Sequence, residues 1–435
     1  MRVLFAVSAW PGHYDPMVPL GRALERSGHC VRVLCDASQA AALARAGLRA
    51  VPVLSSMDML VKARLGNLLS AYEGAWPYAS PPLHPDTGEP LADPERFDFP
   101  QWWGATEPAL TELHRASTDA TADFVRDWVP DVVVHDLLSA EGPFAARLTG
   151  VPAVMHLWGP VGPADRWGPI GCAPERRSRD FLPRDLSGAF ARHGLHGTGG
   201  AVGDSARRAV VIDPCPEPLA QAAVPGVLRL PARYAPYNGP GDVNDLPARS
   251  ARPRICVVWG RSVYRAFGPD SLRVPAVLQA ADELGVEVLL LIGRQELAHC
   301  GELPPSVIPL VGAPLHRVLD GCAAVVHYSG GGSAMTAVAA GVPQLCLPCG
   351  FDQPLIAERL VAAGIAVAVE NHAATVDSVR AALETLLSQA SYRAAALRLR
   401  QRNDALPPPE SLVAQLAGLA PDAGHPAPGS PRPTP

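Results

Sequence analysis

Residues able to bind phosphate and sugar lie close together in the segment 327–353. His327 lies near the end of the apolar run CAAVVHY, which predicts a buried strand, and the turn Ser329-Gly330-Gly331-Gly332-Ser333 follows it. Glycines let a backbone approach a ligand, and the helix expected next would direct unpaired N–H groups at an anion. Asp352 and Gln353 end a second expected strand, QLCLP, where an acid and an amide can hydrogen-bond hydroxyls. The segment predicts a phosphate cradle beside a reader of sugar hydroxyls.

A histidine and an aspartate follow two earlier expected strands. His13 lies just past LFAV (4–7), and Asp136 follows VVVH (132–135). In open α/β sheets ligands bind at this carboxyl edge of the strands. Histidine is the natural base for a hydroxyl proton, and a carboxylate on its far nitrogen would fix its tautomer. A catalytic pair is one interpretation, and simple helix capping is the alternative that the sequence leaves open.

Further along, Arg261 and Ser262 follow the expected strand ICVVW (255–259). They could add a cation and a hydroxyl to a phosphate site, although a solvated arginine is an equally simple interpretation. The glycine turn lacks the Lys-Ser/Thr pair of a Walker motif, and the first turn lacks a dinucleotide fingerprint. Only the whole order of strand, histidine, glycine turn, helix, strand and Asp-Gln is specific.

Bulk composition limits the classes of function. The chain has 435 residues, a net charge of −5 and 48% hydrophobic residues, without a long basic run or a membrane-length apolar run. These values predict a cytoplasmic protein of two domains that binds neither nucleic acid nor membrane. The nine cysteines do not show the spacing of a disulfide framework. Cys346 and Cys349 lie at the end of an expected strand, so we expect them to be structural. No metal-ligand spacing is present, and we expect no metal.

Alternating strands and helices predict the α/β class, with two Rossmann-like, doubly wound domains. We expect the first domain at 1–225, a linker at 226–252, the second domain at 253–405, a crossover helix within 406–420 and a disordered tail at 421–435. Irregular insertions at 74–104 and 158–200 interrupt the first domain. Their aromatic residues, Trp76, Trp102 and Trp158, favour a wall for an apolar acceptor over disorder.

With these motifs in place, the chain resembles the inverting family 1 glycosyltransferases of the GT-B fold. It is most similar to actinobacterial enzymes that transfer deoxysugars to antibiotics. The segments that carry the resemblance begin GHYDPMVPLGRALERSGH and PLHRVLDGCAAVVHYSGGGS, and the match covers residues 1–405. The resemblance implies two domains facing across a cleft, with an acceptor site in the first and a donor site in the second.

The resemblance also implies residue roles. His13 matches the general base, Asp136 its orienting acid, and His327 the contact to the α-phosphate. The remaining matched positions are donor-binding: Gly330 to Ser333 for the diphosphate, Asp352 and Gln353 for sugar hydroxyls, Ala313 to Leu315 for the base, and Arg261 with Ser262 on the phosphate side. The family usually has two histidines and two glycines where this chain has His-Tyr-Ser-Gly, so Ser329 adds a hydroxyl to the turn.

The expected reaction moves a deoxysugar from a nucleoside diphosphate, with thymidine favoured by the resemblance, to a hydroxyl of a polyketide-type natural product. An aromatic carbon is an alternative acceptor, and no cofactor or metal is expected. Two rivals remain: a nucleotide-sugar epimerase on the same fold, and a non-catalytic sugar-nucleotide-binding activator. The sequence leaves open the sugar, the aglycone, a homodimer and a helper protein.

Overall fold

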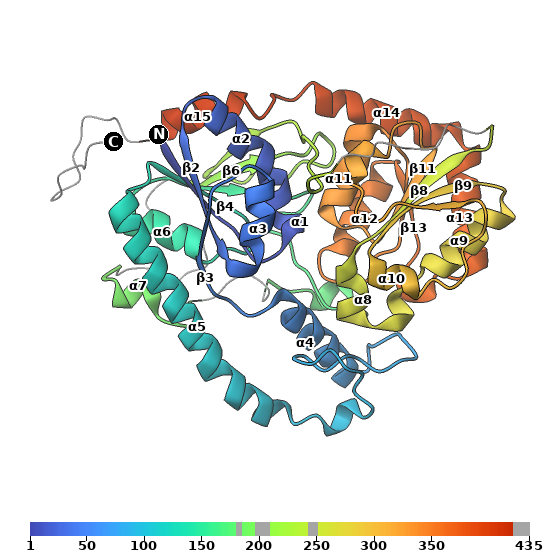
Figure 1. The fold of residues 1–435 in the computed structure, drawn as a ribbon, viewed down its shortest axis with the longest axis horizontal. Coiled ribbons are helices and arrows are strands. Elements are labelled where there is room, and N and C mark those ends of the chain that lie inside the picture. Colours follow the sequence, from blue (N-terminus) through green and yellow to red (C-terminus); the bar gives the residue numbers. More distant parts are fainter. Residues whose placement is uncertain (180–184, 196–208, 242–250, 421–435) are drawn as a thin grey trace.

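The computed structural model describes residues 1–179, 185–195, 209–241 and 251–420, which form two lobes side by side (Figure 1). The tail predicted to be disordered, 421–435, lies outside the described residues, as does 242–250 of the expected linker. Each lobe is built on one parallel sheet, so the predicted α/β class with two Rossmann-like domains is confirmed.

The first lobe contains a seven-stranded sheet in the order β3-β2-β1-β4-β5-β6-β7. Its strands are β1 (Arg2–Ala6), β2 (Cys30–Asp36), β3 (Ala50–Leu54), β4 (Val132–His135), β5 (Ala153–His156), β6 (Ala209–Asp213) and β7 (Val227–Pro231). The order reverses between β1 and β4, and the strands there are almost wholly buried, as their apolar runs require. This reversal is where a doubly wound sheet opens a crevice for ligands.

Strand β7 corrects the expected domain boundary at residue 225. It pairs with β6 from Ala209↔Val227 to Asp213↔Pro231, so the first domain continues through the start of the expected linker. The arginine in VLRLP concealed this short strand, because a charged residue argues against a buried run. In the structure the Arg229 guanidinium donates to Asp213 Oδ2 at 2.9 Å, so the two opposite charges are paired.

The described part of the first half of the chain also contains α-helices. They are α1 (Pro11–Tyr14), α2 (Val18–Arg26), α3 (Ala37–Arg45), α4 (Met59–Tyr72), α5 (Phe99–Trp128), α6 (Glu141–Thr149) and α7 (Ala189–Arg192). Helix α5 begins at Phe99, within the expected irregular insertion 74–104, and α4 was not predicted. Its start was readable, because the Asp58 side chain caps it by accepting from the Leu60 N–H.

The second lobe contains a six-stranded sheet in the order β10-β9-β8-β11-β12-β13, reversing between β8 and β11. Its strands are β8 (Arg254–Trp259), β9 (Glu287–Ile292), β10 (Val307–Pro309), β11 (Ala324–His327), β12 (Gln344–Cys346) and β13 (Ala366–Ala368). Its helices are α8 (Arg261–Phe267), α9 (Val274–Glu283), α10 (Arg294–Ala298), α11 (Gly331–Ala340), α12 (Gln353–Ala362), α13 (Val376–Ser388) and α14 (Ala390–Asp404). Within the described residues, no helix has the length and apolarity needed to cross a bilayer.

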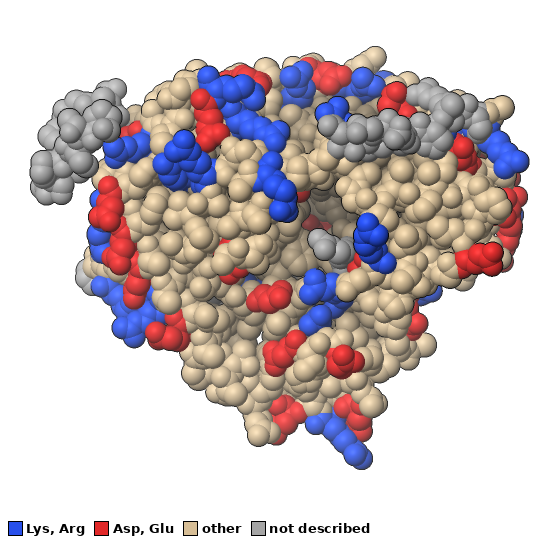
Figure 2. All heavy atoms as spheres, viewed as in Figure 1, with Lys and Arg blue, Asp and Glu red and all other residues tan. Residues whose placement is uncertain are grey.

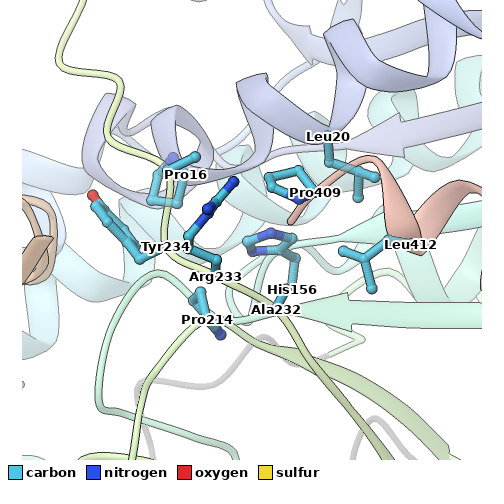
Figure 3. A pocket seen from close by; sticks show the side chains of 10 residues that line it. Pro16, Leu20, His156, Pro214, Ala232, Arg233, Tyr234, Pro409 and Leu412 are labelled. Atoms are coloured by element: carbon cyan, nitrogen blue, oxygen red, sulfur yellow. The ribbon is translucent and has the colours of Figure 1, made fainter. Parts of the chain in front are cut away.

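The chain returns to the first lobe through α15 (Ser411–Leu419), where a crossover helix was expected. This helix packs on α2, and Leu412 and Leu416 join the core of the first lobe (Figure 1). A pocket beside this junction is lined by residues such as His156 and Arg233 (Figure 3). None of the predicted site residues lines it.

Helix α4 and the insertion after it pack on the second lobe although they belong to the first by sequence. The Arg64 guanidinium donates to the Arg265 carbonyl at 2.8 Å, and the Asn67 amide to the Ala266 carbonyl at 2.9 Å. Beyond the helix, the Tyr78 hydroxyl donates to Asn371 Oδ1 at 2.7 Å. These contacts make the insertion a bridge between the lobes.

Candidate active site

The carboxyl ends of central strands from both sheets meet at the seam between the lobes. A Cβ built on Gly159, after β5, would lie 3.1 Å from Gly331 Cα, at the start of α11. The surface is hollowed along this seam (Figure 2). Both reversals of strand order therefore open toward one shared cleft.

His13 lies in this cleft, on the short helix α1 that follows β1. Its Nδ1 lies 2.9 Å from Ser8 Oγ, and its ring stacks on Trp158 with centroids 4.0 Å apart. Burial, together with the positive charge of Lys62, lowers the pKa of His13 to about 3. The imidazole is therefore neutral at physiological pH and able to accept a proton.

Asp136 follows β4 and is fully buried beside this histidine. Its carboxylate accepts the Ser8 N–H at 2.6 Å and the Leu138 N–H at 2.8 Å. The expected direct bond between Asp136 and His13 is wrong, because Ser8 stands between them. Burial raises the pKa of Asp136 to about 6, and the charge of Glu141 adds to this.

Ser8 joins Asp136 to His13. Its backbone N–H donates to the carboxylate, and its Oγ lies 2.9 Å from His13 Nδ1. Among the described residues Nε2 has no hydrogen-bond partner, so it remains available as the basic site. The relay performs the orienting role that the sequence gave to Asp136 alone.

Trp158 lies between the two halves of the site rather than on an acceptor wall. It is 2% exposed, stacks on His13, and donates from Nε1 to Asp352 Oδ2 at 3.1 Å. Such burial leaves little surface for an acceptor, which corrects the expected role of this residue. Trp158 instead links the base of the first lobe to the carboxylate of the second.

His327, the expected phosphate contact, is hydrogen-bonded inside its own domain. The residue is 0% exposed, its Nε2 lies 2.8 Å from Gln344 Oε1, and its Nδ1 accepts the Ser329 N–H at 2.9 Å. Both ring nitrogens are therefore occupied inside the domain. Burial lowers the pKa of His327 to about 4, so the ring is also uncharged.

Ser329 provides the sharp turn that was expected of glycine. Its φ is +66°, in the left-handed region, and its side chain is 0% exposed. The hydroxyl therefore faces the interior beside Cys346 and adds nothing to the cradle, which corrects that expectation. Only its backbone shapes the turn.

The glycines that follow provide space rather than unusual dihedral angles. Gly330 caps α11, and a Cβ on Gly331 would lie 2.7 Å from Trp158 Cδ1. Gly332 and Ser333 complete the first turn, whose N–H groups have no partner within the helix. The N-terminus of α11 keeps the predicted capacity to bind an anion.

Tyr328 takes the position at the phosphate side that sequence reasoning gave to His327. Its hydroxyl lies 2.5 Å from a Cβ built on Gly260 and 3.7 Å from one on Gly330, so it stands between the turns after β8 and β11. Burial raises the pKa of Tyr328. A neutral phenol at this switch point is a hydrogen-bond donor for a phosphate oxygen.

The remaining donor-side residues lie around the same edge. Asp352 Oδ2 accepts the hydrogen bond from Trp158, which leaves Oδ1 available to a ligand. Burial raises the pKa of Asp352 to about 6. Gln353 begins α12, and its Oε1 accepts the Cys349 N–H at 2.9 Å, which leaves its amide nitrogen to donate. The side chain of Arg261 lies outside the described residues.

The segment expected to hold the base lies after β10. Ala313 is half-buried there, whereas the Leu315 side chain is 3% exposed and packs in the core. Any contact from Leu315 to a base must therefore use its backbone, as the resemblance implies. Asn238 of the linker fixes the segment by accepting the His316 N–H at 3.1 Å.

The other two tryptophans lie apart from the cleft centre. Trp76 donates from Nε1 to the Ser80 carbonyl at 2.7 Å and packs on the second lobe. Trp102 donates to Asp86 Oδ2 at 2.7 Å, within an aromatic cluster at the start of α5. Among the ring contacts of the described residues, His13 meets Trp10 and Trp158 but neither of these two, so no wall of three tryptophans forms.

The cysteines are all free thiols. Cys346 and Cys349 are buried, and burial raises both pKa values to about 12, which removes the reactive thiolate of a redox pair. In the described part of the chain, no group of three or more His, Cys, Asp or Glu residues is arranged to hold a metal ion.

Sequence reasoning missed three residues of the cleft: Ser8, Lys62 and Tyr328. Ser8 and Tyr328 each follow an expected central strand by one or two residues, the same signal that identified His13 and His327. Lys62 had a different signal, because it is the only lysine of the chain.

Comparison with known proteins gives the class and the family. The chain matches the family described as erythromycin biosynthesis protein CIII-like, through its N-terminal domain over residues 22–260 and its C-terminal domain over 275–419. L-demethylnoviosyl transferase of Streptomyces niveus is 32% identical, and the match covers 97% of this chain and 100% of that protein. TDP-daunosamine transferase DnrS of Streptomyces peucetius is 32% identical, with 98% of each chain covered.

Solved structures agree. Spinosyn rhamnosyltransferase SpnG complexed with thymidine diphosphate has a TM-score of 0.70 at 27% identity, covering 96% of this chain and 100% of that chain. Two Rossmann-like domains that share one cleft at their carboxyl edges thus define a glycosyltransferase of the GT-B class. The chain belongs to the erythromycin biosynthesis protein CIII-like family, and the predicted family 1 resemblance is confirmed.

Proposed function

We propose that this glycosyltransferase moves a deoxysugar from a thymidine diphosphate donor to a hydroxyl of a polyketide-type aglycone, with inversion. One observation supports this most: Trp158 stacks on His13 with ring centroids 4.0 Å apart and also lies against Gly331, at the N-terminus of α11. The base and the anion site therefore share one small volume. The relatives named for TDP-daunosamine transfer and for bound thymidine diphosphate support the choice of nucleotide.

His13 begins the reaction by removing the acceptor proton through Nε2. The oxygen then bonds to the anomeric carbon on the face opposite the diphosphate, whose bond to that carbon breaks. Asp136, acting through Ser8, stabilises the imidazolium that forms. The glycoside and the nucleoside diphosphate leave, and His13 returns its proton to solvent.

The departing diphosphate gains negative charge, and the second lobe can stabilise it. The first N–H groups of α11, with the positive end of its dipole, face that charge. The Tyr328 hydroxyl adds a neutral donor beside Ser262. We infer that these groups act without a metal or another cofactor, so an excess of chelator should leave the rate unchanged.

Asp352 and Gln353 lie where the sugar of the donor would be read. Trp158 already uses Asp352 Oδ2, so a sugar hydroxyl would bond Oδ1 or displace the indole. The amide nitrogen of Gln353 is directed by the bond that its oxygen accepts. Because Trp158 also contacts His13, sugar binding would be sensed directly at the base.

The rival functions fit less well. An epimerase needs no acceptor base, and a non-catalytic activator needs no relay from Asp136 through Ser8 to His13. The free thiols are consistent with the cytoplasmic location that we also propose.

The decisive experiment is product analysis from a matrix of nucleotide sugars and of aromatic and macrolide aglycones. We expect a glycoside and thymidine diphosphate in equal amounts from a thymidine donor, with and without chelator. Donor incubated alone is the control for epimerisation. An epimer from donor alone, or no glycoside over the whole matrix, would contradict the proposal.

A further inference from the structure

The only lysine of the chain lies in the catalytic cleft. Among the 37 lysine and arginine residues, Lys62 alone is lysine. It lies in the first turn of α4, whose buried face carries Leu60, Arg64 and Asn67 and packs on the second lobe. Position 62 lies about 200° around the helix from Leu60, so its side chain points away from that packing, and it is exposed.

Hydrogen bonds fix the start of α4 next to the first lobe. The Ser55 N–H donates to Ser117 Oγ at 3.1 Å, and that hydroxyl donates to Glu141 Oε1 at 2.8 Å. The segment that leads into α4 is thereby joined to α5 and to the first turn of α6. Glu141 is 6% exposed, so its carboxylate is a buried charge at the start of α6.

The Lys62 ammonium acts on the reacting end of this cleft. Its charge interacts with His13 from α1, Asp136 after β4 and Glu141 from α6. Its side chain reaches solvent, yet surrounding protein lowers its pKa, as expected for a group in a recess. Among the described residues, no carboxylate lies within 4.0 Å of the ammonium.

An unpaired cation at this place opposes the chemistry of a neutral acceptor. Proton uptake makes His13 positive, and a second positive charge nearby disfavours that step. A negative oxygen on the acceptor would offset the lysine and restore the basicity of His13. The titratable groups that interact with Lys62, which are His13, Asp136 and Glu141, belong to the first lobe, so we infer that the acceptor supplies that oxygen rather than the donor diphosphate.

We propose that Lys62 determines acceptor specificity by pairing with an acidic oxygen of the aglycone, a phenolate, enolate or carboxylate, beside the hydroxyl that His13 deprotonates. This inference rests on the proposed function and adds the class of acceptor to it. Aglycones with an acidic aromatic or enolised oxygen are preferred over their O-methylated forms.

A matched pair of probes tests the preference: 1,2-dihydroxyanthraquinone and its 2-methyl ether. We expect the wild type to bind the acidic compound more tightly, and Lys62→Met to reduce the ratio of the two affinities roughly tenfold. Lys62→Arg should keep most of the ratio, because it keeps the charge. Arg400→Met, which removes a charge that is 51% exposed on α14, is the control.

The single lysine also permits a direct measurement. Reductive methylation with ¹³C-formaldehyde labels only Lys62 and the N-terminal amine. Adding the acidic probe should shift the Lys62 signal and raise its pKa, whereas thymidine diphosphate should not. Equal affinity of the wild type for both probes, including no affinity for either, overturns the proposal.

Two further outcomes separate this inference from its rivals. If Lys62 changes only the pKa of the catalytic groups and does not contact the acceptor, Lys62→Met will shift the acidic limb of the pH–rate profile equally for both acceptors. The ratio of the two affinities will then stay the same. Sugar transfer without a probe preference refutes the lysine role alone. A probe preference without sugar transfer to any acceptor refutes the proposed function alone.

Discussion

A serine between an acid and a histidine distinguishes the base of this enzyme from a direct pair. The Ser8 N–H donates to Asp136, and Ser8 Oγ lies 2.9 Å from His13 Nδ1, so one residue connects the carboxylate to the imidazole. The sequence located both ends of this relay by their strands, but it could not show the distance between them. The width of that gap depends on how β1 and β4 end, which only the folded backbone determines.

The pH dependence of the reaction follows from this relay. His13 stays unprotonated to about pH 3, whereas Asp136 becomes neutral as the pH falls through about 6 and then stabilises an imidazolium poorly. The rate should therefore fall on the acidic side near pH 6 rather than near pH 3. Profiles of kcat/KM test this, and Asp136→Asn should be slow and should lose that limb. Asp352→Asn is the control, because the pKa of Asp352 is also about 6. This variant should keep the acidic limb.

Tyr328 and His327 make opposite predictions for donor binding. Tyr328→Phe removes one hydrogen bond to the diphosphate, worth about 1 kcal/mol, and should weaken thymidine diphosphate binding roughly fivefold. His327→Gln should instead lower the melting temperature, since it breaks bonds to Gln344 and Ser329, with little change in that affinity. Titration calorimetry with thymidine diphosphate and thermal unfolding of both variants test this. Weaker nucleotide binding by His327→Gln, with unchanged binding by Tyr328→Phe, would assign the phosphate contact to His327.

At the scale of elements, the start of α11 couples the lobes as well as facing the phosphate. A methyl group on Gly331 would meet Trp158, whereas the nearest atom to one on Gly332 is Tyr234 Oη at 4.0 Å. Gly331→Ala should displace the indole from His13 and lower kcat on the order of tenfold or more. Gly332→Ala is the matched control for glycine loss in the same turn. Equal kcat values for the two variants would show that the contact with Trp158 has no catalytic role.

The elements show what sequence reasoning could reach. Apolar runs identified the central strands, because those strands are buried on both faces. Helix α4 and strand β7 were missed, and in the structure an interlobe contact and an arginine–aspartate pair stabilise them. The glycine turn was located, but its positive φ belongs to Ser329, which residue type alone argued against.

At the scale of the whole molecule, two reversed strand orders face one cleft. Candidate residues that follow expected strands predicted the carboxyl edge of each sheet. The family resemblance implied that these two edges face each other. Trp158 was misassigned because a tryptophan in an irregular segment gives no sign of whether it lines a pocket or fills the seam. In the structure Trp158 is 2% exposed, so it fills the seam.

The account depends most on His13 as the base of sugar transfer across this cleft. The most direct test compares glycoside formation by the wild type and by His13→Ala, with thymidine diphosphate affinity measured on both. We predict a loss of at least roughly 100-fold in turnover with nearly unchanged nucleotide binding, as expected when a general base is removed. Turnover by His13→Ala close to that of the wild type would contradict the account.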